Sequence, residues 1–210
     1  TPKVYINQSW DVKNSTLNVS FEQKLDSNFN NENVEMVIPI LYSCYSKGKD
    51  SKRLVEDQLF VLDKYKKNLK IKNLDSDIDP PVLSIFRGFS APVNWEIDLS
   101  IDDYLFLFLN DNDYFTKWDS GQFLMRKIIK SRIENQLDSK LEEKFNIAIK
   151  KSVGSLESKD LSLLATLITS PGLSEIEILF EKVNPILIYK ECIKFQVSIG
   201  ANLHKEFRKL

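Results

Sequence analysis

Apolar and polar residues alternate along the first half of the chain, from Pro2 to about Asp98. Alternation with a period of two is typical of strands that bury one face. Polar breaks separate the alternating runs, so the pattern predicts six or seven short strands and, from them, a small β-sandwich. The runs lie at residues 17–21, 34–44, 59–62, 69–71 and 93–97.

Pro39 interrupts the second of these runs. Because proline has no backbone N–H to donate to a neighbouring strand, it predicts either an edge strand or a bulge at this point.

After Ser100 the apolar residues recur every three or four positions, which predicts helices. Ser100 with Asp103, and Ser174 with Glu177, are expected to cap helix starts, and Asn184 before Pro185 is expected to begin the last helix. Consecutive helices on short loops indicate a bundle or the start of an α-solenoid. The apolar stripes lie at residues 105–109, 115–133, 137–148, 161–168 and 184–210.

The segment 84–93, Ser-Ile-Phe-Arg-Gly-Phe-Ser-Ala-Pro-Val, joins the two patterns. A surface linker is usually small and polar, whereas this one carries Ile85, Phe86 and Phe89. We therefore expect a packed, rigid joint between two modules, 1–98 and 99–210. The fold class is α+β, with a sandwich followed by antiparallel helices.

Charge and composition exclude some functions. The 210 residues include 29 basic and 30 acidic side chains, for a net charge of −1, so no overall field would attract nucleic acid or an anionic membrane. No apolar run approaches the roughly 20 residues of a membrane-spanning helix. The chain begins with Thr1 and its last helix lacks a polar cap at Leu210, so we expect a piece of a longer polypeptide.

Two cysteines, Cys44 and Cys192, lie one in each half. Two buried free thiols are the favoured interpretation and a disulfide between them the alternative, which indicates a reducing, cytoplasmic compartment.

Candidate catalytic and metal-binding residues are few. The only histidine, His204, lies beside an apolar helical stripe with Ile193, Val197 and Phe207, and we expect it to be a partly buried packing residue. A zinc hydrolase needs several close nitrogen or sulfur ligands, and a serine hydrolase needs a nucleophile elbow; neither pattern is present. We therefore assign no catalytic, cofactor-binding or metal-binding residue in this chain.

The remaining polar clusters have simpler interpretations. Asp75, Asp77 and Asp79 have the alternate spacing of a calcium loop, but prolines follow where such a loop needs glycine, so we expect a solvated turn. The run 110–113 is expected to cap a helix, and 47–49 to form a hairpin turn. The three tryptophans are expected in the cores; they are Trp10, Trp95 and Trp118.

Four segments together resemble the aminopeptidase N family of zinc-dependent alanyl aminopeptidases, which are gluzincin metallopeptidases. The joint at 84–93 is similar to that family's Phe-Arg-Gly/Glu-Phe-Ser-Ala-Pro-Val pattern, and Asp-Tyr-Phe-Thr-Lys-Trp-Asp-Ser-Gly-Gln at 113–122 is similar to its aromatic-x-Arg/Lys-Trp-Asp-x-x-Gln pattern. Thr-Pro-x-Val at 1–4 and Leu-Ile-Thr-Ser-Pro at 167–171 are supporting matches. The resemblance covers the whole chain, and the first motif is its most specific part.

The resemblance implies an immunoglobulin-like third domain followed by the start of a helical C-terminal domain with an armadillo- or HEAT-like superhelix. It also implies that the zinc ligands, the general-base glutamate of His-Glu-x-x-His and the Gly-x-Met-Glu-Asn segment lie elsewhere in the parent. The expected function is therefore that of a non-catalytic fragment that links the catalytic domain to a helical lid.

This chain alone is expected to be inactive and to bind no cofactor, the zinc belonging to the parent. Its expected partners are the parent's other domains, with a peptide substrate in the parent and neither nucleic acid nor membrane. The alternative is an independent sandwich-plus-helix adaptor that binds a protein partner.

Overall fold

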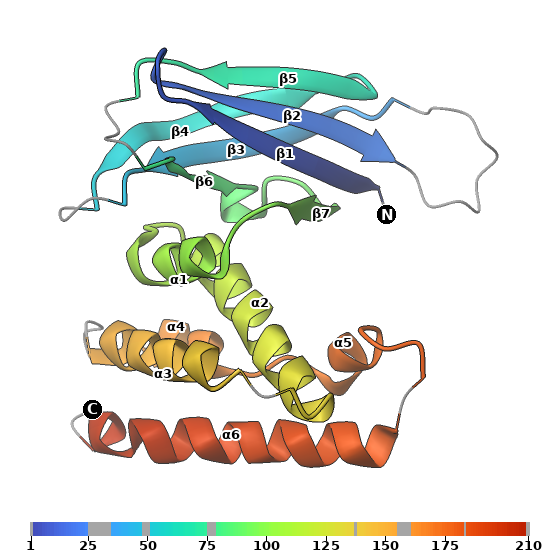
Figure 1. Cartoon of the computed structure of the whole chain (residues 1–210), viewed down its shortest axis with the longest axis vertical. Helices are drawn as coiled ribbons and strands as arrows, with labels where there is room; N and C mark the ends of the chain where they lie inside the picture. Colours follow the sequence, from blue (N-terminus) through green and yellow to red (C-terminus); the bar gives the residue numbers. More distant parts are fainter. Residues whose placement is uncertain are drawn as a thin grey trace. The chain divides into compact units, whose positions relative to one another are not determined.

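The computed structural model describes residues 2–24, 35–47, 51–74, 79–136, 138–154, 161–182 and 184–208. The chain divides into two compact units, Thr1–Ser100 and Ile101–Leu210. The first is built of strands and the second of helices (Figure 1). The expected succession of strands and then helices is confirmed.

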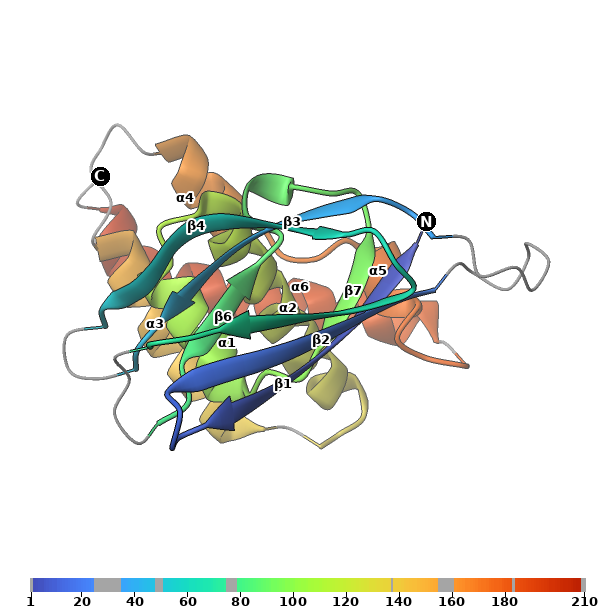
Figure 2. The same cartoon turned by 90° about the horizontal axis from the view of Figure 1, so that it is seen from above.

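The first unit is a sandwich of two sheets (Figures 1 and 2). One sheet has the order β5-β2-β1-β7 and the other the order β4-β3-β6. All strand pairs are antiparallel except β1 with β7, which is parallel. The strands are β1 (Lys3–Asp11), β2 (Thr16–Lys24), β3 (Ile38–Tyr45), β4 (Arg53–Leu62), β5 (Lys66–Ile71), β6 (Val82–Ile85) and β7 (Asn94–Ile97).

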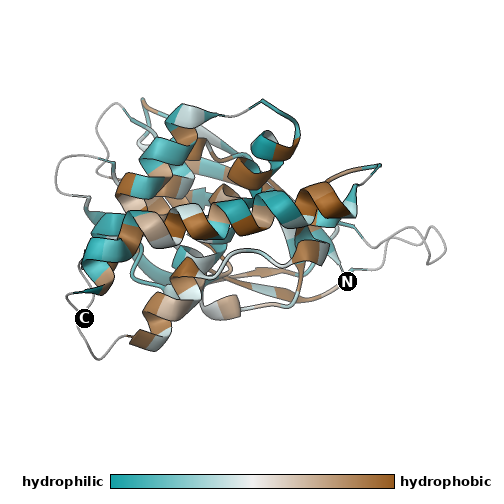
Figure 3. Ribbon diagram, turned by 90° about the horizontal axis from the view of Figure 1, so that it is seen from below, coloured by the Kyte–Doolittle hydropathy of each residue, from teal (hydrophilic) through white to brown (hydrophobic). Residues whose placement is uncertain are grey.

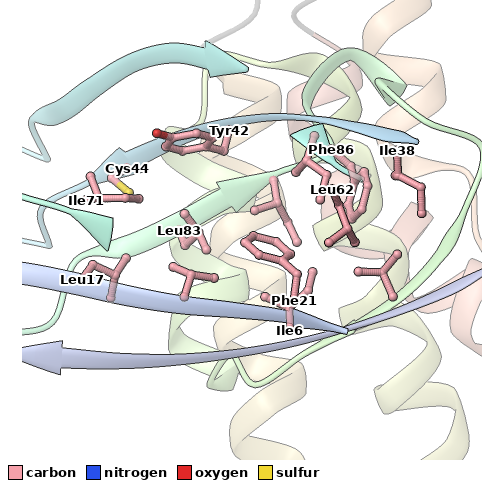
Figure 4. Close-up of a cluster of buried hydrophobic side chains, with 14 of the residues drawn as sticks. Ile6, Leu17, Phe21, Ile38, Tyr42, Cys44, Leu62, Ile71, Leu83 and Phe86 are labelled. Atoms are coloured by element: carbon pink, nitrogen blue, oxygen red, sulfur yellow. The ribbon is translucent and has the colours of Figure 1, made fainter. Parts of the chain in front are cut away.

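The predicted alternation places the sandwich core correctly. On β2, Leu17, Val19 and Phe21 are buried, whereas Ser20 between them is exposed. Phe21 stacks on Phe60 of β4 with 4.9 Å between ring centroids, so an aromatic contact joins the two sheets. Figure 4 shows Leu17 and Phe21 of β2 meeting buried apolar side chains of the other sheet, such as Leu62 and Leu83, between the sheets. Their burial removes apolar surface from water, which is the main favourable contribution to folding.

Pro39 lies where β3 has only one neighbouring strand. It is paired with Val61 of β4, while β6 pairs only with the stretch from Tyr42 to Tyr45. The missing N–H of Pro39 therefore disrupts no ladder with β6. The expected edge position applies to this part of β3, and the register shifts lie further along, between Tyr42 and Tyr45.

The second unit packs its helices around a row of three aromatic rings. The ring centroid of Phe145 on α3 lies 5.6 Å from that of Phe108 on α1 and 6.4 Å from that of Phe195 on α6. The Phe145 side chain therefore contacts both neighbouring helices. A Cβ at Gly121 of α2 would lie 3.0 Å from the Phe108 ring, so a larger residue there would require the ring to shift, and glycine lets the two helices pack closely. The helices are α1 (Ile101–Asn110), α2 (Tyr114–Ile133), α3 (Ser139–Gly154), α4 (Leu161–Ile168), α5 (Leu173–Glu177) and α6 (Pro185–Phe207).

Two of the expected helix starts have a visible cap. The Asp113 carboxylate accepts the backbone N–H of Thr116 at 2.8 Å, and the Asn184 side chain accepts that of Leu187 at 3.2 Å. The prediction at Ser174 is wrong, because the cap is Gly172 and α5 begins at Leu173, two residues earlier than a cap at Ser174 would require. There the Glu175 carboxylate accepts the backbone N–H of Gly172 at 2.7 Å.

Candidate functional site

The strongest candidate for a functional feature is the joint at 84–93, which begins at the end of β6 and leads into β7. Its backbone forms a single 3₁₀ turn, η1 (Arg87–Phe89). Phe86, Gly88 and Phe89 have positive φ angles of 53°, 58° and 55°. Glycine adopts this conformation without penalty, but phenylalanine does so at a cost that the surrounding structure must offset.

Packing of Phe86 is one such offset. Its side chain is fully buried and stacks on Trp95 of β7 with 4.7 Å between ring centroids. Ile85, Ala91 and Val93 are also buried, so the segment is packed as expected. The expected position between the two modules is wrong, because the segment lies within the first unit and connects β6 of one sheet to β7 of the other. Phe89 differs from the expectation, because 53% of its surface is exposed.

Arg87 supplies the polar anchor of the joint. Only 3% of this residue is exposed, which is unusual for a cation unless hydrogen bonds satisfy it. Its Nε donates to Asp57 Oδ1 at 2.6 Å, and its Nη1 donates to Ser84 Oγ at 3.0 Å and to the Tyr45 hydroxyl at 3.3 Å. Asp57 also pairs with Arg53. The turn is thereby bonded to β4, β3 and β6 of one sheet.

Ser90 also bonds the segment to β3, at backbone groups that β6 does not pair with. The backbone N–H of Leu41 donates to Ser90 Oγ at 3.1 Å, and the Ser90 hydroxyl donates to the carbonyl of Pro39 at 3.1 Å. These are backbone groups of β3 in the part that β6 does not reach. One side chain thus satisfies polar groups that would otherwise need a strand or water.

A second candidate is a shallow aromatic groove on the helical unit, with a cavity volume of about 460 Å³. Phe115 and Trp118 are among its lining residues, with 5.7 Å between their ring centroids. Beside it on α2, burial raises the pKa of the Asp119 carboxyl to about 6, against a smaller opposing influence of Arg126. The groove is lined by Tyr114, Phe115, Trp118, Ser162, Leu163 and Thr166.

The structure does not gather the chemically reactive residues into one place. Cys44 and Cys192 are buried free cysteines, as expected, and burial raises the pKa of the Cys44 thiol to about 12. His204 is exposed, so its expected partial burial is wrong. The reason is that α6 buries a different stripe, the one containing Cys192, Phe195 and Leu203.

The tryptophans are less buried than expected. Trp10, Trp95 and Trp118 are all half-buried, although Trp10 and Trp95 pack against the sandwich core. Of the polar clusters, Asp75 and Asp77 lie outside the described residues, as do residues 48 and 49 and two apolar positions, Val34 and Leu137. Asp113 caps α2, which confirms the interpretation of the run 110–113.

The donor groups that the structure describes do not cluster as a zinc site requires. Within the described ranges, no group of three histidine, cysteine, aspartate or glutamate side chains is placed to hold a metal ion. His204 and Cys192 are on α6 and Cys44 is on β3, and neither thiol is exposed. The described residues therefore do not fit a zinc centre. Across the same residues, no helix combines the length and apolar character that crossing a membrane requires.

The sequence matches two adjacent family profiles. Residues 1–98 match a domain of unknown function, DUF3458, described as an Ig-like fold, and residues 101–210 match its companion DUF3458_C, described as ARM repeats. The aminopeptidase N of Caulobacter vibrioides is 29% identical over 161 residues, which is 77% of this chain and 18% of that protein. The aminopeptidase N of Haemophilus influenzae is 23% identical over 219 residues, covering 100% of this chain and 25% of that protein.

A solved structure has the same fold. Aminopeptidase A of Legionella pneumophila, crystallised with aspartic acid, aligns with a TM-score of 0.78 at 21% identity over 99% of this chain and 23% of its own. The chain thus spans about a quarter or less of the length of these relatives.

The fold defines an Ig-like sandwich followed by an armadillo-type helical array. The chain belongs to the DUF3458 family, whose Ig-like and ARM-repeat domains are those of aminopeptidase N.

Proposed function

We propose that this chain is a non-catalytic part of a zinc metallo-aminopeptidase, in which it links a catalytic domain to a helical lid. The parent removes N-terminal amino acids from peptides, and its zinc and catalytic residues lie outside this chain. The observation that carries the proposal is the combined match of both units to aminopeptidase domains, together with the small share of each relative that the chain covers. The parent's catalytic domain is the proposed partner.

The segment 84–93 supports a stable sandwich unit within the linking chain. It connects β6 of one sheet to β7 of the other, and packing of Phe86 and the hydrogen bonds of Arg87 and Ser90 hold its backbone. We place the boundary between the two modules at 98/99, immediately after β7. A cytoplasmic parent follows from the two free thiols, which suit a reducing compartment.

The reading frame that contains this segment tests the proposal. We expect it to continue upstream of Thr1 and to encode a His-Glu-x-x-His motif about one domain earlier, where it supplies the zinc ligands and general base. Start and stop codons that flank the 210 residues would overturn the proposal. The chain would then be an independent adaptor.

A further inference from the structure

We draw no further inference here: the strongest candidate, the exposed apolar stripe along the long helix α6 (Figure 3), formed by Ile186, Tyr189, Ile193 and Val197, carries nothing because nothing in the structure shows what covers it.

Discussion

The sandwich and the helical array cover their apolar surfaces in different ways. In the sandwich, the two sheets face each other, and the strands turn polar residues such as Asn7 and Ser20 outward. In the array, α6 carries one apolar stripe inward and a second outward. Two sheets that pack face to face bury each other's apolar faces. In an array of helices, each helix buries its apolar surface only where a neighbouring helix packs on it. The difference is that the sandwich buries its main apolar faces between its own two sheets, whereas α6 leaves one apolar stripe exposed.

The largest loss of stability is expected from a substitution in the sandwich core, at Phe86 of the segment 84–93. Phe86→Ala removes a fully buried ring that stacks on Trp95, and we expect it to lower the free energy of unfolding by about 3–5 kcal/mol. Urea denaturation of the chain measures this loss. Phe89→Ala, in the same turn but 53% exposed, is the control and should change stability by less than about 0.5 kcal/mol. Similar effects of the two substitutions would contradict the anchoring role of Phe86.

The next effect compares the ion pair between the buried Arg87 and Asp57 of the sandwich with an exposed pair of the array. Arg87→Ala removes the hydrogen bonds that this guanidinium donates to Asp57, Ser84 and Tyr45, and we expect a loss of about 2 kcal/mol. Lys144→Ala removes a surface pair with Asp102, and we expect a loss of at most about 0.5 kcal/mol. Raising the salt concentration should weaken the contribution of Lys144 more than that of Arg87. Equal losses in urea titrations would show that the joint is not held by Arg87.

Asp119 of the helical unit should make stability fall as pH rises. Its folded-state pKa of about 6 lies above the ordinary value of 3.8, so the folded state holds the proton more tightly. The loss of folding stability caused by ionising this buried carboxyl grows from pH 3.8 to 6 and is complete above pH 6. We expect Asp119→Asn to stabilise the chain by about 1–2 kcal/mol at pH 7 and by little at pH 3.5. A stabilisation that does not vary between these pH values would contradict the raised pKa.

Glu22 of the sandwich should make stability rise with pH, which is opposite in sign to the effect of Asp119 and smaller in size. Hydrogen bonds from Lys66, Tyr65 and Lys24 lower the pKa of its carboxyl to about 2, against an ordinary value of 4.5. The folded state therefore gains stability above pH 4.5 and loses it as pH falls towards 2. Glu22→Gln should flatten this part of the pH–stability curve, with the largest difference from the unsubstituted chain at neutral pH and low salt. A curve with unchanged slope between pH 4.5 and 2 would contradict the assignment.

Alternation predicted those strands that bury one face and expose the other. Leu17, Val19 and Phe21 are buried as the period of two requires. It could not find β6, because all four of its residues are buried and the run Val82–Ile85 has no alternation to detect. The strand β4 begins at Arg53, six residues before the apolar run that predicted it. Its middle, residues 56–58, is polar and exposed and separates Leu54 and Val55 from that run.

In the helical half, apolar periodicity predicts the buried face of a helix only where the helix has one apolar stripe. Leu141, Phe145 and Ala148 of α3 are buried as predicted, because that helix has a single apolar stripe. On α6 the predicted stripe of Ile193, Val197 and Phe207 is exposed, and His204 beside it is exposed as well. The helix buries the stripe that contains Cys192, Phe195 and Leu203 instead, and periodicity alone does not distinguish the two faces. At the joint, the motif indicated packing, but the buried hydrogen bonds of Arg87 and Ser90 depend on strands distant in sequence.

The most direct test of the proposed function is an aminopeptidase assay with an alanyl chromogenic substrate in the presence of zinc. The 210-residue chain is compared with the polypeptide encoded by the complete reading frame, each before and after treatment with a chelator. We predict zinc-dependent hydrolysis by the complete polypeptide and none by the chain. Zinc-dependent turnover by the chain alone, or its absence in the folded complete polypeptide, would contradict the assignment of this chain as a non-catalytic part of an aminopeptidase.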